Sequence, residues 1–172
     1  MGDVRASVIE QFEATQAGDP WFGSSRAALL AGLTRADAAA HPVSGAHSIW
    51  ELVLHMTAWT REVTRRLAGG VPALPADGDW PGVSEMSDAA WDRAQEELAE
   101  AHADLVAAIR TLPPDGWERG VGDLREPALG TGVDVAGMII GLAQHDAYHI
   151  GQIAVTRRAV VSAIGGRASN QG

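Results

Sequence analysis

The chain has 172 residues, of which 46% are hydrophobic and 20% charged, so neither a disordered polar tract nor a membrane-embedded protein is expected. Its length suits one domain, and we treat residues 1–172 as a single domain with one hydrophobic core. The formal charge of −9 repels a phosphate backbone and argues against nucleic acid as a partner.

The first predicted helix comes in two pieces. Helical periodicity begins near the start of the chain and stops at Gly18-Asp19-Pro20. The second piece resumes after Ser24-Ser25 and runs through Leu33, and residues 34–40 form one further short turn. Strand signals are scarce here and throughout the chain.

The second predicted helix has well-marked ends. Ser48 and Glu51 have the spacing of a capping box, in which each side chain satisfies a free backbone amide at a helix start. The helix therefore begins near Ile49 and runs to about Leu67, before two glycines. Residues 70–87 are too rich in proline, glycine and aspartate for a regular element and form a long connection.

The third predicted helix opens after Ser87 as its N-cap and ends before Pro113-Pro114. A second irregular connection follows over residues 115–131, and the fourth predicted helix covers roughly residues 133–163. Four amphipathic helices with two long connections predict an all-α fold, a four-helix bundle whose core can hold a metal or cofactor site.

The start of the chain lacks the apolar segment of a signal peptide. No apolar run approaches the roughly 18 residues that cross a bilayer. We therefore expect a cytoplasmic protein without a membrane partner.

The fourth predicted helix carries His145 and His149, four residues apart, so both rings project from one face about 6 Å apart along the axis. This is the spacing of a two-imidazole metal clamp. The chain contains no cysteine, so any metal site must use imidazole or oxygen ligands. The alternative is a pair of neutral core histidines, each hydrogen-bonded to a carbonyl or a carboxylate.

On the second predicted helix, His55 lies at the edge of the apolar face, where a lone histidine is more often structural than a ligand. If this helix neighbours the fourth one, His55 completes a facial triad with His145 and His149 and leaves a coordination position open. Glu51 or Gln152 is then a further ligand or a partner that fixes an imidazole tautomer.

Other polar positions allow two interpretations each. Tyr148 either hydrogen-bonds a ligand or packs against a helix, and His102 is either a fourth ligand or a core or interface histidine. Asp146 is either an acceptor beside the site or a surface or interface charge. His41 and His47 are expected to be exposed.

The tryptophans and the arginines of the second helix have plainer interpretations. We expect Trp50, Trp59 and Trp91 to pack in the core, and Trp80 and Trp117 to lie in connections that could cover a pocket at the end of the bundle. The basic cluster Arg61, Arg65 and Arg66 is expected on a solvated face.

Two segments of the chain together resemble a known family. They are His47-Ser48-Ile49-Trp50-Glu51-Leu52-Val53-Leu54-His55-Met56-Thr57-Ala58-Trp59 and Gly141-Leu142-Ala143-Gln144-His145-Asp146-Ala147-Tyr148-His149-Ile150-Gly151-Gln152-Ile153. Asp79-Trp80-Pro81 and a tryptophan early in the third predicted helix lie between them. In these motifs and their separation, the chain resembles the DinB-like superfamily from about Trp21 to Arg158.

The resemblance implies a four-helix bundle in an up-down-down-up arrangement, often a homodimer, with a three-histidine site for a divalent metal such as zinc or nickel. By motif position, the implied ligands are His55, His145 and His149. Characterised relatives include thiol-dependent S-transferases and isomerases that use mycothiol or bacillithiol as co-substrate, whereas many members have no assigned reaction.

Several functions stay open at this point. The leading hypothesis is a metal-dependent enzyme with a small-molecule substrate, for which the resemblance favours thiol S-transfer over metal-assisted hydrolysis. Glu51, Gln152 and Tyr148 are the candidates for a catalytic role. The alternatives are a stress-associated metal-binding protein without turnover, whose closed site would include His102 or Glu51, and a metal-free bundle with buried histidines.

Overall fold

A computed structural model describes the backbone of residues 4–168 and the side chains of residues 5–162. Four long helices form a bundle, and two short helices connect the first to the second. The long helices are α1 (Val4–Ala17), α4 (Ile49–Leu67), α5 (Asp88–Arg110) and α6 (Val135–Ala168), and the short ones are α2 (Arg26–Leu30) and α3 (Arg35–Ala39). None of the helices in this part of the chain combines the length and apolar character needed to cross a bilayer.

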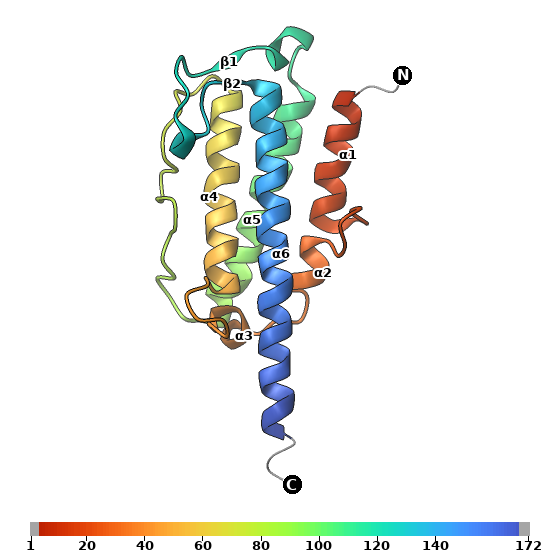
Figure 1. Ribbon diagram of the computed structural model, residues 1–172, viewed down its shortest axis with the longest axis vertical. Helices are drawn as coiled ribbons and strands as arrows, with labels where there is room; N and C mark the ends of the chain where they lie inside the picture. The colour runs from red at the N-terminus through yellow and green to blue at the C-terminus, as the bar shows by residue number, and fades with distance from the viewer. Residues whose placement is uncertain (1–3, 169–172) are drawn as a thin grey trace.

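The long helices have the up-down-down-up arrangement. In Figure 1, α1 and α6 run from the top of the view to the bottom, whereas α4 and α5 run from the bottom to the top. This confirms the predicted all-α bundle. As predicted, the first helix is interrupted at Gly18-Asp19-Pro20, and α2 and α3 are the second piece and the further short turn. The second piece ends at Leu30 and not at Leu33, because Gly32 has a positive φ.

The starts of α4 and α5 agree with the predicted caps. Ser48 Oγ accepts a hydrogen bond from the Glu51 amide (3.2 Å), and the Glu51 carboxylate accepts one from the Ser48 amide (2.8 Å). Ser87 Oγ accepts from the amide of Ala90 (3.1 Å) at the start of α5. These bonds satisfy amides that have no partner within the helix, so local sequence alone defines both boundaries.

The connection between α4 and α5, residues 68–87, has to return along the bundle because the two helices are parallel. A helix of 19 residues such as α4 is about 28 Å long. In Figure 1 this connection descends beside α4 on its outer side, and contains no helix or strand, as predicted.

The connection between α5 and α6 contains more structure than predicted. It includes the 3₁₀ turns η1 (Pro114–Trp117) and η2 (Pro127–Leu129) and the strands β1 (Gly120–Val121) and β2 (Val133–Asp134). The strands are antiparallel, with Gly120 opposite Asp134 and Val121 opposite Val133. As a result α6 begins at Val135 and not at residue 133. Two-residue strands are too short for an alternating pattern to reveal them.

The core consists of two apolar clusters at opposite ends of the bundle. One cluster begins at Val63 on α4 and ends at Leu142 on α6. The other cluster ends at Met56 on α4 and begins at Ile150 on α6. The residues between these limits are largely polar and include His145 and His149 of the predicted triad, and His55 lies directly beside the limit at Met56. Trp50 and Trp91 pack in one cluster with ring centroids 5.4 Å apart, as expected.

The basic cluster at the end of α4 is not a solvated face throughout. Arg66 is 2% exposed and donates to the Glu62 carboxylate (2.7 Å) and to the carbonyls of Leu129 (2.6 Å) and Ala73 (2.8 Å). Glu62 also accepts from Arg65 and from the amide of Ala73. The prediction is wrong for Arg66 because Glu62, one turn earlier, neutralises its charge and both long connections cover it.

Candidate metal centre

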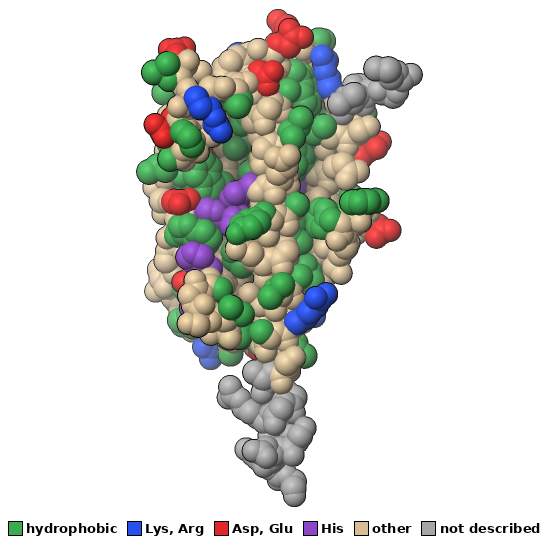
Figure 2. All heavy atoms as spheres, in the orientation of Figure 1, with side chains coloured by type: hydrophobic (Ala, Val, Ile, Leu, Met, Phe, Trp, Pro, Cys, Tyr) green, Lys and Arg blue, Asp and Glu red, His purple; other side chains and the backbone are tan. Residues whose placement is uncertain are grey.

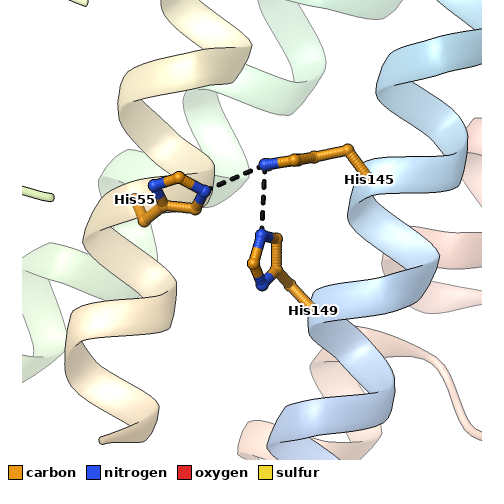
Figure 3. Close-up of side chains that lie close together, drawn as sticks. All are labelled: His55, His145 and His149. Atoms are coloured by element: carbon orange, nitrogen blue, oxygen red, sulfur yellow. Dashed lines mark hydrogen bonds between the residues drawn. The ribbon is translucent and has the colours of Figure 1, made fainter. Parts of the chain in front are cut away.

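Three imidazoles from two helices meet between the apolar clusters. His55 projects from α4, and His145 and His149 project from α6 toward it (Figure 3). The Nε2 atom of His145 lies 2.9 Å from Nε2 of His55 and 3.1 Å from Nε2 of His149. The predicted juxtaposition of the three histidines is confirmed.

Hydrogen bonds at the opposite ring nitrogens determine two of the tautomers. Nδ1 of His55 is 2.5 Å from the carbonyl oxygen of Asp79, and Nδ1 of His149 is 2.6 Å from Oε1 of Gln152. Carbonyl and amide oxygens only accept, so both Nδ1 atoms carry the proton. In the neutral rings, Nε2 of His55 and Nε2 of His149 therefore present lone pairs toward His145.

With these tautomers, too few protons are present for the two contacts that Nε2 of His145 makes with the other imidazoles. Nε2 of His145 touches two lone pairs but carries at most one hydrogen when its ring is neutral. One of the two short contacts must then oppose lone pair to lone pair. A cation placed among the three nitrogens removes that conflict.

The spacing of the nitrogens fits a divalent cation. A metal about 2.1 Å from three imidazole nitrogens, with angles between 90° and 110°, places those nitrogens about 3.0–3.4 Å apart. The distance of 3.1 Å lies within that span and the distance of 2.9 Å lies just below it. Three neutral imidazoles suit zinc, nickel, copper and iron, so these ligands fit a divalent transition-metal ion but do not select one metal.

The surroundings favour the neutral form of two of the rings, those of His149 and His55. Burial lowers the pKa of His149 to about 4, with further lowering by His145 and His55, although the hydrogen bond to Gln152 opposes it. Burial also lowers the pKa of His55, against the opposing hydrogen bond to the Asp79 carbonyl. Neutral imidazole is the form that binds metals, so protons compete weakly for both rings at neutral pH.

Trp80 covers one side of the site. Its ring stacks on His55 (centroids 3.8 Å apart) and on His47 (3.6 Å), so it lies between them. The preceding residue, Asp79, accepts a hydrogen bond from Trp59 Nε1 through Oδ1 (2.7 Å), which fastens this part of the connection to α4. Trp80 lies in the connection between α4 and α5 as predicted, but it covers His55 and not a pocket at the end of the bundle.

The site can be reached from outside. Histidine side chains are visible at mid-height of the face in Figure 2, in a shallow depression bordered by hydrophobic side chains. His145 keeps 28% of its side chain exposed, whereas His55 and His149 are buried.

Two other predicted candidates lie apart from the three nitrogens. The Glu51 carboxylate caps α4 and contacts Nε2 of His41 (3.0 Å) and Nδ1 of His47 (3.4 Å), both of which are exposed as expected. Tyr148 is 65% exposed and meets His149 only with its ring, at a centroid distance of 5.1 Å. The Glu51 carboxylate therefore does not join the three nitrogens, and the catalytic roles considered for Glu51 and Tyr148 stay predictions.

His102 is buried outside the triad, which agrees with a core histidine and not with a fourth ligand. Asp146 is fully buried rather than a surface charge, with Oδ1 3.6 Å from Nδ1 of His145 and Oδ2 3.8 Å from the Arg26 guanidinium. Sequence reasoning missed Arg26, because a short helix without periodicity gives no sign of burying a charge.

We expect Gln152→Leu to weaken metal binding by about 10- to 100-fold, because the variant loses the acceptor that fixes the His149 tautomer. Competition of zinc between the protein and a chromogenic chelator measures this affinity. Gln144→Leu, an exposed position on the same helix, is the matched control and should bind as the unmodified chain does. Equal affinities for both variants would show that the Gln152 hydrogen bond does not support the site.

A family model described as the DinB superfamily matches residues 25–153, about three quarters of the chain. The matched segment begins just before α2 and ends within α6, so it includes all three histidines, the whole of α4 and the part of α6 that presents His145 and His149. No curated protein and no solved structure matches the chain.

Proposed function

The chain belongs to the DinB superfamily, and from this premise we propose that it is a divalent-metal-dependent enzyme with His55, His145 and His149 as ligands. The observation that carries the proposal is the set of three convergent Nε2 atoms, two of which must present lone pairs. Such a set is costly to bury without a cation among the nitrogens.

The ligand set favours catalysis over a purely structural metal. Structural zinc sites in proteins close with four protein ligands, whereas catalytic sites use three and keep a position open. Among the described side chains, no cysteine, aspartate, glutamate or further histidine joins the three imidazoles. The position left open is available to a substrate or to water.

We further propose that the reaction is the transfer of a low-molecular-weight thiol to a small electrophile. When bound, the cation supplies Lewis acidity that lowers the pKa of a coordinated thiol or water. In the transfer, the thiol loses its proton to solvent, its sulfur forms a bond to an electrophilic carbon, and the leaving group departs with the electrons of the broken bond. The protein itself favours the neutral form of His55 and His149, and Trp80 shields His55 from water.

A cobalt-substituted protein tests this function. Titration with a small thiol, such as 2-mercaptoethanol or cysteine, should produce a new sulfur-to-cobalt charge-transfer band in the near ultraviolet with a one-to-one end point. Gly151→Ala is the control variant and should give the same band as the unmodified chain, because a Cβ at this exposed position of α6 meets open space.

The outcome discriminates between reaction classes. If the spectrum responds to hydroxide or to a carboxylate but not to thiols, the proposal of thiol transfer is wrong and metal-assisted hydrolysis takes its place. A spectrum that responds to none of them would indicate a closed site and a protein without turnover.

A further inference from the structure

A cavity of about 340 Å³ opens directly beside the three histidines and touches them through His145. At about 30 Å³ for each water-sized group, it accommodates on the order of ten such groups. Most of its wall is apolar, with Trp59 and Val63 from α4 and Met138 and Leu142 from α6. Its size and character are those of a small-molecule site.

The cavity is elongated along the bundle. On α4 its lining extends from Trp59 to Arg66, and on α6 from His145 back to Gly137. At 1.5 Å per helical residue, these spans are about 10–12 Å. At the end away from His145, the connection between α5 and α6 lines the cavity over residues 127–130.

Arg125 belongs to the lining contributed by that connection and is exposed. One of its Nη atoms donates to the carbonyl of Thr131 (2.9 Å), and no carboxylate of the described residues forms an ion pair with it. The backbone at this point is held firmly, since Thr131 Oγ1 donates to the Leu124 carbonyl (2.7 Å) and accepts from the Glu126 amide (3.0 Å).

The second arginine of the lining does not offer a free charge. Arg66 is buried, and the Glu62 carboxylate neutralises it while two backbone carbonyls occupy its Nη atoms. In a chain with a net charge of −9, Arg125 is therefore the unneutralised cation of this cavity. Its guanidinium can bind a carboxylate through two parallel hydrogen bonds.

We propose that this cavity binds the electrophilic substrate of the centre, and that the substrate is a small molecule with an apolar body and one carboxylate. The apolar body lies between α4 and α6, the reacting carbon is at the His145 end, and the carboxylate binds Arg125 at the other. This inference rests on the proposed function in one respect, namely that the molecule bound in the cavity is the substrate of the metal-dependent reaction. Binding at Arg125 itself requires no metal.

Isothermal titration calorimetry with two probes tests the assignment. The probes are 4-phenylbutyrate, which has an aromatic body and a carboxylate, and 4-phenylbutanamide, which has the same shape and no charge. We expect the carboxylate to bind about tenfold tighter than the amide in zinc-loaded protein. The ratio of the two affinities should stay the same in metal-free protein, and it should fall to about one in the Arg125→Gln variant.

A pair of glycine variants tests the location. A Cβ at Gly141 meets open space and this residue lines the cavity, so Gly141→Leu should fill the cavity and reduce binding of both probes at least tenfold. Gly151→Leu makes the same change on the same helix, also into open space, outside this cavity, and should bind as the unmodified chain does. Circular dichroism verifies that both variants are folded.

Three results would overturn the proposal. They are equal binding of the two probes, a carboxylate preference that survives Arg125→Gln, and a preference that disappears when the metal is removed. The last would assign recognition of the carboxylate to the metal. Failure of the proposed function is separate, because a protein that binds no metal can still distinguish the two probes in this cavity.

Discussion

Replacing both His145 and His149 with alanine is expected to reduce the metal content from about one ion per chain to none. The two residues supply two of three convergent ligands from one helix, and His55 alone retains a divalent cation poorly. Plasma mass spectrometry on untagged protein, after incubation with zinc or nickel and removal of unbound metal, measures the content.

His41→Ala/His47→Ala is the matched control for this experiment. It also removes two imidazoles, but both are exposed and contact Glu51, and His47 stacks on the face of Trp80 that is turned away from His55. It should keep its metal. If the unmodified chain holds no metal after incubation with zinc and with nickel, the proposed ligands and the enzyme proposal that depends on them are both refuted.

Glu62→Ala is expected to lower the free energy of unfolding by about 3–5 kcal/mol. The variant leaves Arg66 buried and charged without its carboxylate, and it removes the acceptor for the amide of Ala73. Burial alone raises the pKa of Glu62, but hydrogen bonds from Arg65 and Arg66 more than offset it, so the pKa lies below its ordinary value. The carboxylate is therefore charged at neutral pH. Urea unfolding followed by circular dichroism measures the change.

Glu97→Ala provides the comparison on the same helix bundle. Glu97 pairs with Arg61 at 3.0 Å, but both side chains remain partly exposed to water (39% and 45%), so its loss should cost about 0–1 kcal/mol. A Glu62→Ala variant no less stable than Glu97→Ala would mean that water reaches Arg66 and compensates its charge.

The sequence predicts those parts of the fold that local interactions determine. The bounds of α4 were predictable because its capping box and terminal glycines act within a few residues. The orientation of His145 and His149 was predictable because spacing along one helix fixes it. The convergence of His55 on them needed the additional knowledge that α4 and α6 are neighbours, which the family resemblance implied.

The missed features all depend on contacts between distant segments. The Asp79 carbonyl that holds His55 is a backbone group, and every residue has one, so no residue type marks it. The burial of Arg66 depends on two connections that fold over it, with acceptors at Ala73 and Leu129. Asp146 and Arg26 approach each other in the core although 120 residues separate them in the chain, beyond the reach of a periodic pattern.

The parallel direction of α4 and α5 has a consequence for how the centre is adjusted. Carbonyls inside a helix are occupied by their own backbone amides, so an imidazole on a helix must find a backbone acceptor elsewhere. The chain returning from α4 to α5 places one at Asp79, where it makes the His55 ring a stronger electron donor. Residues 74–78, which lie between Ala73 at the Glu62–Arg66 pair and Asp79 at His55, can therefore change in length or composition and alter the affinity of the proposed site for a divalent cation, while the contacts of Ala73 with α4 are kept.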